Sequence, residues 1–413
     1  MQVRRPLLII VTTCCLAFII SEFLRNSIGV IAPNLADDFG LEPSDLGLLS
    51  GVFFLSFGCV QLPLGICLDR FGARLTLSLC LLLTALSCVL FAIAQNFDNM
   101  ILARVFMGVG CSPLLMGPML LYSRWFARER FASITGFHIG IGGLGTIGAT
   151  APFAFATATI GWRNSFWCFA ILSILVAWAM YAFIRDAPDG HTPHPKESWR
   201  QAMQGLKEVL LHPDVKKLLP LNITGYACFV TLLGLWFSPY LADVHGFGLE
   251  ARGDALLLVS LVHTCAILLW SNADVWMNSR KIPVLIGMSV SVALMLTLAV
   301  LPNPSSTTVV AIFVAQGIFA GYMPALLAHG RSLFPDRLTG RGITLFNMVN
   351  ILGVFLLQSL TGFLLQFFLP HPEAATPEEA YRGIFALLAL LLAASGAAYA
   401  CARDRPPREI PSG

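Results

Sequence analysis

Apolar residues run along this chain in long stretches that are separated by short polar segments. A helix that crosses the hydrocarbon core of a bilayer needs about 20 mostly apolar residues. Stretches of that kind predict spans near residues 8–32, 44–68, 75–95, 99–123, 132–158, 165–185, 218–241, 254–275, 282–301, 307–330, 342–369 and 380–401. The pattern therefore predicts an all-α integral membrane protein with about twelve transmembrane helices.

Composition agrees with surroundings that are mostly lipid. Of the 413 residues, 56% are hydrophobic and 12% are charged, whereas about a quarter of the residues of a soluble domain are charged. The net charge of +3 and the lack of a basic run give no sign of a nucleic-acid partner. The cysteines all fall in apolar stretches, without the spacing of disulfides or metal ligands, so we expect no metal and no cofactor.

Positive charges predict the orientation of the chain. The segments expected on the cytoplasmic side hold most of the 26 lysines and arginines, and the opposite loops hold Arg163, Arg252 and Arg382. This bias predicts an inner-membrane protein with both termini in the cytoplasm. The first apolar run resembles a signal peptide, but it continues past Glu22 without a small-residue cleavage site, so we expect a retained first helix.

A long polar segment divides the chain into two parts. We expect an N-terminal six-helix half over residues 1–185, a cytoplasmic loop over 186–217 and a C-terminal six-helix half with a short cytoplasmic tail over 218–413. Within the loop, residues 198–211 alternate apolar and charged side chains at helical spacing. This segment is either a helix along the cytoplasmic face or a disordered linker.

The two halves look like copies of each other. Asp69 after the second span recurs as Asp274 after the eighth, 205 residues on, and Gly108 recurs as Gly317, 209 residues on. A near-constant offset of about half the chain is typical of transporters built from two parallel repeats.

The strongest motif lies between the second and third spans and contains Gly65, Asp69, Arg70, Gly72 and Arg74. Gly65 permits close helix approach, Asp69 suits a pairing with arginines or a helix N-terminus, and Gly72 permits a tight turn. In spacing and position the motif resembles the loop between helices two and three of the major facilitator superfamily. The resemblance implies a fold of two pseudo-symmetric halves around a central cavity, and it implies that this cluster latches the cytoplasmic gate.

Other segments carry the same resemblance over nearly the whole chain. Arg104 and Gly108 in the fourth span look like the membrane-embedded arginine motif of the family, and residues 161–163 and 334–347 are similar to two of its loops. The second copy of the gate motif has decayed, because Trp270 replaces its glycine, so we expect a weaker latch there. The fifth span also lacks the Gly-Pro pair of drug–proton exporters, which weakens that alternative.

Ionisable residues at membrane depth are costly and are therefore candidates for function. Glu22 and Arg25 lie one turn apart on the first span. At 1.5 Å per residue, Arg25 is roughly 10 Å and Arg104 roughly 8 Å from the outer ends of their helices, so both guanidinium groups are expected at one level of the cavity. A net positive, otherwise apolar cavity favours an anion, which makes Arg25 and Arg104 candidate substrate ligands and Glu22 the candidate proton carrier. Alternatively, Glu22 only neutralises an arginine in a structural ion pair.

Further polar and aromatic residues remain open between function and packing. His138 and His263 are either proton carriers or hydrogen-bonded packing residues. The seventh span carries three aromatic residues, Tyr226, Trp236 and Tyr240. They either line the cavity or pack within the bundle or at the membrane interface. We expect Tyr226 and Trp236 to contact the substrate.

Together these observations predict a monomeric secondary active transporter, coupled to protons, that moves a small organic anion by alternating access. Proton-driven efflux of drugs or other amphipathic compounds is the leading alternative. A membrane enzyme or a receptor is a remote one, because no nucleophile, metal or phosphate-binding motif is visible in the spans.

Overall fold

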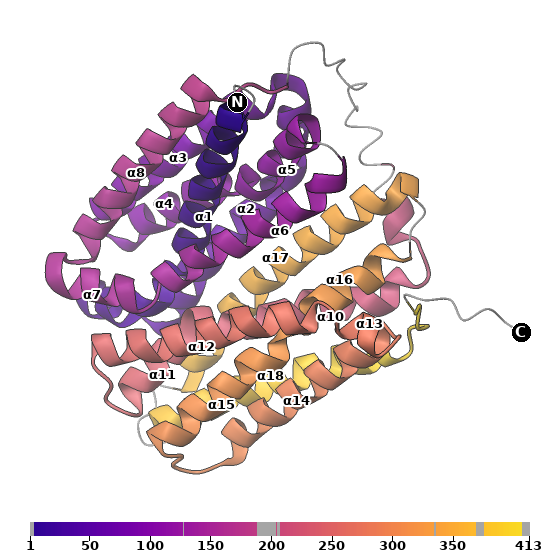
Figure 1. Cartoon of the computed structure of the whole chain (residues 1–413). Coiled ribbons are helices and arrows are strands. Elements are labelled where there is room, and N and C mark those ends of the chain that lie inside the picture. The colour runs from indigo at the N-terminus through magenta and orange to yellow at the C-terminus, as the bar shows by residue number, and fades with distance from the viewer. Residues whose placement is uncertain are drawn as a thin grey trace, which may run out of the picture. The chain divides into compact units, whose positions relative to one another are not determined.

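The computed structural model describes residues 4–126, 128–187, 204, 207–333, 336–368 and 376–406 (Figure 1). All regular secondary structure in these ranges is helical, as the apolar pattern predicted. The expected surface helix over residues 198–211 lies mostly outside the described residues, and so do the first residues of the predicted loop similarity at 334–347.

The chain divides into two compact units. One is formed by Met1–Phe39 and Val52–Trp199, and the other by Gly40–Gly51 and Arg200–Gly413. The helices up to residue 183 are α1 (Arg4–Phe39), α2 (Pro43–Phe71), α3 (Ala73–Ala92), α4 (Phe97–Cys111), α5 (Pro113–Trp125), α6 (Arg128–Gly148), α7 (Ala151–Ile160) and α8 (Trp162–Phe183). The later helices are α10 (Val215–Thr231), η1 (Leu232–Trp236), α11 (Phe237–Asp243), α12 (Leu249–Trp270), α13 (Ala273–Trp276), α14 (Lys281–Val300), α15 (Ser306–Phe319), η2 (Ala320–Tyr322), α16 (Met323–Arg331), α17 (Asp336–Phe368) and α18 (Pro377–Ala400). The half boundaries expected at residues 185 and 218 stay predictions.

The predicted number of spans agrees with these helices. Within the described residues, 11 segments are long and apolar enough to cross a membrane, and α6 with α7 makes a twelfth that is bent by 42°. Pro152 explains the bend, because it lacks an N–H and its ring would collide with the carbonyl of Gly148, four residues earlier.

Three other spans contain irregular backbone near their middle. Pro113 starts α5 directly after α4, a π-helical turn at Leu232–Trp236 precedes Pro239, and a 3₁₀ turn at Ala320–Tyr322 precedes Pro324. Each proline removes one helical hydrogen bond, which explains why the helix changes its winding there. Irregular backbone at membrane depth is tolerated only where protein buries it or where it lines a cavity. The expected fourth, seventh and tenth helices are thus interrupted, in addition to the bent fifth.

The packing inside each unit follows the repeat that the sequence predicted. In the first unit α1 packs on α6, and α3 packs on α4 and α8. In the second unit α10 packs on α17, and α14 packs on α15 and α18. The outward faces stay apolar, with Leu175 and Trp178 of α8 56% and 61% exposed, as expected for side chains that meet lipid.

Candidate functional site

Glu22 and Arg25 form an ion pair in the middle of α1. Arg25 Nη1 lies 3.0 Å from Glu22 Oε1, and the two side chains are only 10% and 14% exposed. The Arg25 guanidinium also lies 5.0 Å from the centre of the Phe57 ring, in reach of a cation–π interaction. Charges at this depth of a membrane helix are expensive to desolvate, so the pair is the best candidate for a functional site in the first unit.

Helix α6 supports the carboxylate of Glu22. The Thr146 hydroxyl donates to Glu22 Oε2 at 3.5 Å, and the Asn26 side-chain amide donates to the Glu22 carbonyl and to the Thr146 hydroxyl. The helices approach closely at Gly145, where an added Cβ would lie 2.8 Å from the Cβ of Glu22. The sequence did not single out Asn26 or Thr146, although Asn26 lies four residues after Glu22 and glycines surround Thr146.

Arg104 lies beside the same stretch of α1 but is fully buried. Its Nη1 donates to the Leu24 carbonyl at 2.9 Å, and its guanidinium lies 4.7 Å from the centre of the Phe53 ring. Both predicted arginines thus lie at one part of α1. Arg104 binds the Leu24 carbonyl of the α1 backbone, and Arg25 pairs with the Glu22 carboxylate. Arg104 connects α4 to α1, and the Glu22–Arg25 pair is the less deeply buried part of the cluster.

His138 lies further along the contact between α1 and α6. Its Nδ1 is 3.0 Å from the Tyr122 hydroxyl and 3.6 Å from Cys15 Sγ, and the Phe18 ring stacks on the imidazole. These contacts favour the packing alternative for His138, because they join α1, α5 and α6.

His263 and the aromatic residues of the seventh span make similar packing contacts. The His263 Nδ1–H donates to the Gly317 carbonyl at 2.8 Å. Trp236 is buried, and its indole N–H donates to Thr361 Oγ1 at 2.7 Å. Tyr240 is buried against aromatic rings of α18, whereas Tyr226 is half-buried. These contacts favour packing for Trp236 and Tyr240, and substrate contact by Tyr226 and Trp236 stays a prediction.

The predicted cytoplasmic gate residues lie where α2 ends and α3 begins. Asp69 and Arg70 are exposed at the end of α2, and an added Cβ at Gly65 would meet nothing within 4 Å. Gly72 is the N-cap of α3 with φ 86° and ψ 161°, a conformation that is essentially restricted to glycine. An added Cβ there would overlap the Asp186 carboxylate.

Asp186, which follows α8 in the sequence, caps helix α3. Its Oδ1 accepts from the Arg74 amide at 2.8 Å, which satisfies an N–H that has no partner inside the helix. The Arg74 side chain contacts the end of α8, since its Nε donates to the Tyr181 carbonyl at 2.7 Å and its guanidinium lies over the Tyr181 ring. The motif therefore joins the start of α3 to the end of α8.

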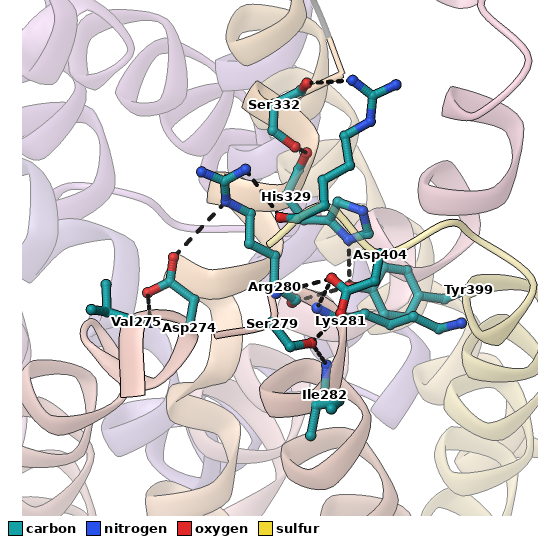
Figure 2. Close-up of polar contacts among 11 residues, drawn as sticks. Asp274, Val275, Ser279, Arg280, Lys281, Ile282, His329, Ser332, Tyr399 and Asp404 are labelled. Atoms are coloured by element: carbon teal, nitrogen blue, oxygen red, sulfur yellow. Dashed lines mark hydrogen bonds and ion pairs between the residues drawn. The ribbon is translucent and has the colours of Figure 1, made fainter. Parts of the chain in front are cut away.

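The second unit has a corresponding cluster at the start of α14, shown in Figure 2. Asp404 Oδ1 accepts from the amides of Arg280 and Lys281 at 3.1 and 3.2 Å, and the Ser279 hydroxyl donates to Asp404 Oδ2. The same hydroxyl accepts from the Ile282 amide at 2.9 Å. Burial acts to raise the pKa of Asp404, but these hydrogen bonds outweigh it and hold the pKa below its usual value.

Neither capping aspartate was predicted, yet the sequence contains a signal for both. Each follows the last helix of its half in the same local pattern, with Arg185 and Pro188 around Asp186 and Arg403 and Pro406 around Asp404. A search for repeats that extended past the apolar spans would have found this pattern.

Comparisons with known proteins agree with the architecture. The sequence profile of the Major Facilitator Superfamily matches residues 14–273 and 255–413. The chain is 22% identical to the "Probable L-galactonate transporter" of Escherichia coli over 368 residues, 84% of this chain and 81% of the relative. It is 26% identical to the nitrate/nitrite transporter NrtP of Picosynechococcus sp. over 294 residues, 64% of this chain and 52% of the relative.

The fold is also similar to a solved structure. A bacterial homolog of the human lysosomal transporter Spinster, in an inward-facing and unoccupied conformation, superposes with a TM-score of 0.79 at 19% identity and covers 94% of this chain and 95% of that one. From the profile match over nearly its whole length, the chain belongs to the Major Facilitator Superfamily.

Proposed function

We propose that this protein is a proton-coupled secondary transporter of a small organic anion. The observation that carries the proposal is the ion pair of Glu22 and Arg25 on α1, whose side chains are only slightly exposed. A carboxylate and a guanidinium in direct contact at membrane depth can exchange one partner for another, which is what coupling between a proton and an anion requires.

The charge of the site favours an anionic substrate. Glu22, Arg25 and Arg104 together carry a formal charge of +1. A guanidinium presents a planar fork of N–H donors that matches a planar oxyanion. Two relatives are named as transporters of galactonate and of nitrate, and a carboxylate and a nitrate share that planar geometry.

Competition for Arg25 supplies the coupling. While Glu22 is ionised, its carboxylate occupies Arg25 at 3.0 Å. A proton that binds Glu22 removes this negative charge, and the carboxylate of the substrate then takes its place on Arg25. Loss of the proton on the other side of the membrane restores the internal pair and expels the substrate. Arg104 adds positive potential and holds α1 in position through the Leu24 carbonyl.

The remaining features are proposed by the same reasoning. We place the protein in the bacterial inner membrane with both termini in the cytoplasm, on the bias of its lysines and arginines. We also propose that it acts as a monomer. Gly65, Asp69, Arg70, Gly72 and Arg74 form its cytoplasmic gate. The halves move against each other by alternating access, without a chemical reaction of the substrate.

The test is transport and binding of L-galactonate and nitrate by purified protein in liposomes, with an imposed pH gradient. Arg25→Ala is expected to weaken binding at least tenfold, since loss of a charged, desolvated contact costs about 2–5 kcal/mol. Arg25→Lys does not restore it fully, because an ammonium lacks the planar fork. Glu22→Gln is expected to abolish uphill accumulation while exchange of substrate continues.

Arg130→Ala is the matched control, because it removes an exposed arginine at the start of α6. Uphill accumulation by Glu22→Gln that still follows the pH gradient would rule out Glu22 as the coupling residue. If the protein transports an amphipathic cation such as ethidium and binds no anion, efflux is the better account.

A further inference from the structure

His329 sits at a polar junction that the transport mechanism above does not use. It lies in the last turn of α16 and is fully buried. Figure 2 shows its ring between the start of α14 and the segment that follows α18. Its Nε2 lies 3.0 Å from the Arg403 carbonyl, and its Nδ1 lies 2.7 Å from the Tyr399 hydroxyl.

The hydrogen-bond partners determine where the imidazole carries its proton. The Arg403 carbonyl only accepts, so His329 Nε2 carries a hydrogen in every protonation state. The other nitrogen faces a hydroxyl, which both donates and accepts. The Tyr399 hydroxyl in turn lies 3.5 Å from the carbonyl of Arg280, the N-cap residue of α14.

This chain of contacts satisfies both protonation states of His329 without moving its heavy atoms. In the neutral state the Tyr399 O–H donates to Nδ1. When a proton binds Nδ1, the new N–H donates to the Tyr399 oxygen, and the Tyr399 O–H turns towards the Arg280 carbonyl. One proton is added to the imidazole, and Tyr399 keeps its own.

Burial and charged groups of both signs act on this imidazole. Burial is the largest influence and disfavours the cationic form, Asp404 favours it, and Arg280 and Arg405 oppose it. Both arginines are engaged elsewhere, because Arg280 lies 4.0 Å from the Asp274 carboxylate and Arg405 donates to the Ser332 carbonyl. The C-terminal end of α16 also favours a positive charge.

We propose that His329 is a proton-binding site that controls the anchoring of α14. Proton binding turns the Tyr399 hydroxyl from His329 to the Arg280 carbonyl and so adds a hydrogen bond at the start of α14. Histidine is the side chain whose ordinary titration range, about pH 5 to 8, makes such a switch physiological. The site is separate from Glu22 and does not depend on proton coupling of transport.

The experiment is amide hydrogen exchange of the first turn of α14, measured between pH 5.5 and 7.5 on the purified full-length protein in detergent and corrected for intrinsic exchange. Wild-type protein is expected to protect this turn more strongly at pH 5.5, with a one-proton transition. His329→Gln, which keeps a donor and an acceptor but does not titrate, is expected to lose the transition. Tyr399→Phe is expected to lose it too, because the hydroxyl that reaches Arg280 is gone.

A direct titration separates binding of the proton from its effect. In protein with ¹⁵N-labelled histidine, one resonance that disappears in His329→Gln is expected to titrate in wild type and in Tyr399→Phe. His245→Gln, which removes a histidine from the loop after α11, is the matched control and is expected to keep the transition. A His329 resonance that does not titrate between pH 5 and 8 overturns the proposal, and so does protection of α14 that is independent of pH or stronger at pH 7.5.

Discussion

The N-terminus of α3 and the N-terminus of α14 are equivalent places in the two repeats, here called the two corners. Each is capped by an aspartate, but different residues make room for it or bind it. Each corner must bring an aspartate from beyond the last helix of its half onto a helix N-terminus. At α3 the Asp186 carboxylate occupies the place where a side chain of residue 72 would lie, which is possible because that residue is glycine. At α14 it is achieved by an added donor, because the Ser279 hydroxyl binds Asp404. The decayed motif of the second half has therefore kept the contact while losing the sequence pattern.

The contacts of the two corners also differ in kind. Asp404 accepts from Ser279, Arg280 and Lys281, whereas among the described contacts Asp186 accepts from the amide of Arg74. Arg74 stacks on Tyr181, while Arg280 lies between Asp274 and the backbone of Arg405. The expectation of a weaker second latch rested on sequence decay alone and stays a prediction. The described capping contacts are more numerous at α14 than at α3.

The largest loss of stability is expected from Gly72→Ala, at the α3 corner. Its methyl group would overlap the Asp186 carboxylate, and its backbone would keep a conformation that costs a non-glycine residue about 1–3 kcal/mol. Thermal unfolding in detergent, followed with a dye that reacts with newly exposed cysteines, is expected to show a clear loss of stability. Gly65→Ala is the control, because an added Cβ there meets nothing within 4 Å and alanine favours a helix. Equal stability of Gly72→Ala and wild type would show that the Asp186 cap does not need a glycine at residue 72.

Removal of each capping aspartate gives the next largest effect. Asp404→Ala and Asp186→Ala are each expected to cost about 1 kcal/mol, the typical value of a helix cap, with Asp404→Ala the more harmful. The pKa of Asp404 is lowered in the folded state, so its contribution is present above the usual value of 3.8 and is lost as the pH falls through the lowered value.

A pH series of unfolding measurements checks both parts of this expectation. The difference between wild type and Asp404→Ala is expected to be constant near neutral pH and to shrink below about pH 4. A larger loss of stability for Asp186→Ala than for Asp404→Ala would contradict the expectation that the cap of α14 contributes more.

The smallest expected effect comes from Asp274→Asn. The Asp274 carboxylate lies 4.0 Å from Arg280 Nε, at the limit of an ion pair, and its other oxygen binds the adjacent Val275 amide, which an asparagine oxygen also binds. The stability of this variant is expected to stay within about 0.5 kcal/mol of wild type. A loss as large as that of Asp404→Ala would mean that the second corner depends on the repeated aspartate after all.

Much of the first unit's site was predictable because its members are near in sequence. Glu22 and Arg25 are one helical turn apart, so their pairing follows from helix geometry alone. Arg104 was expected at the level of Arg25, and its described partner is the Leu24 carbonyl, which has no side-chain signature in the sequence. The partners of His329 could not be predicted for the same reason, since one of them is a backbone carbonyl, that of Arg403.

The sequence by itself determined the number of spans, the repeat and the family, because hydrophobic length and periodicity are properties of each segment alone. Only the tertiary structure decided that Asp186 and Asp404 cap distant helices, that Trp236 binds Thr361 and that Tyr399 stands between His329 and Arg280. A buried polar group must find a hydrogen-bond partner, and which one is within reach depends on how helices far apart in the chain pack together.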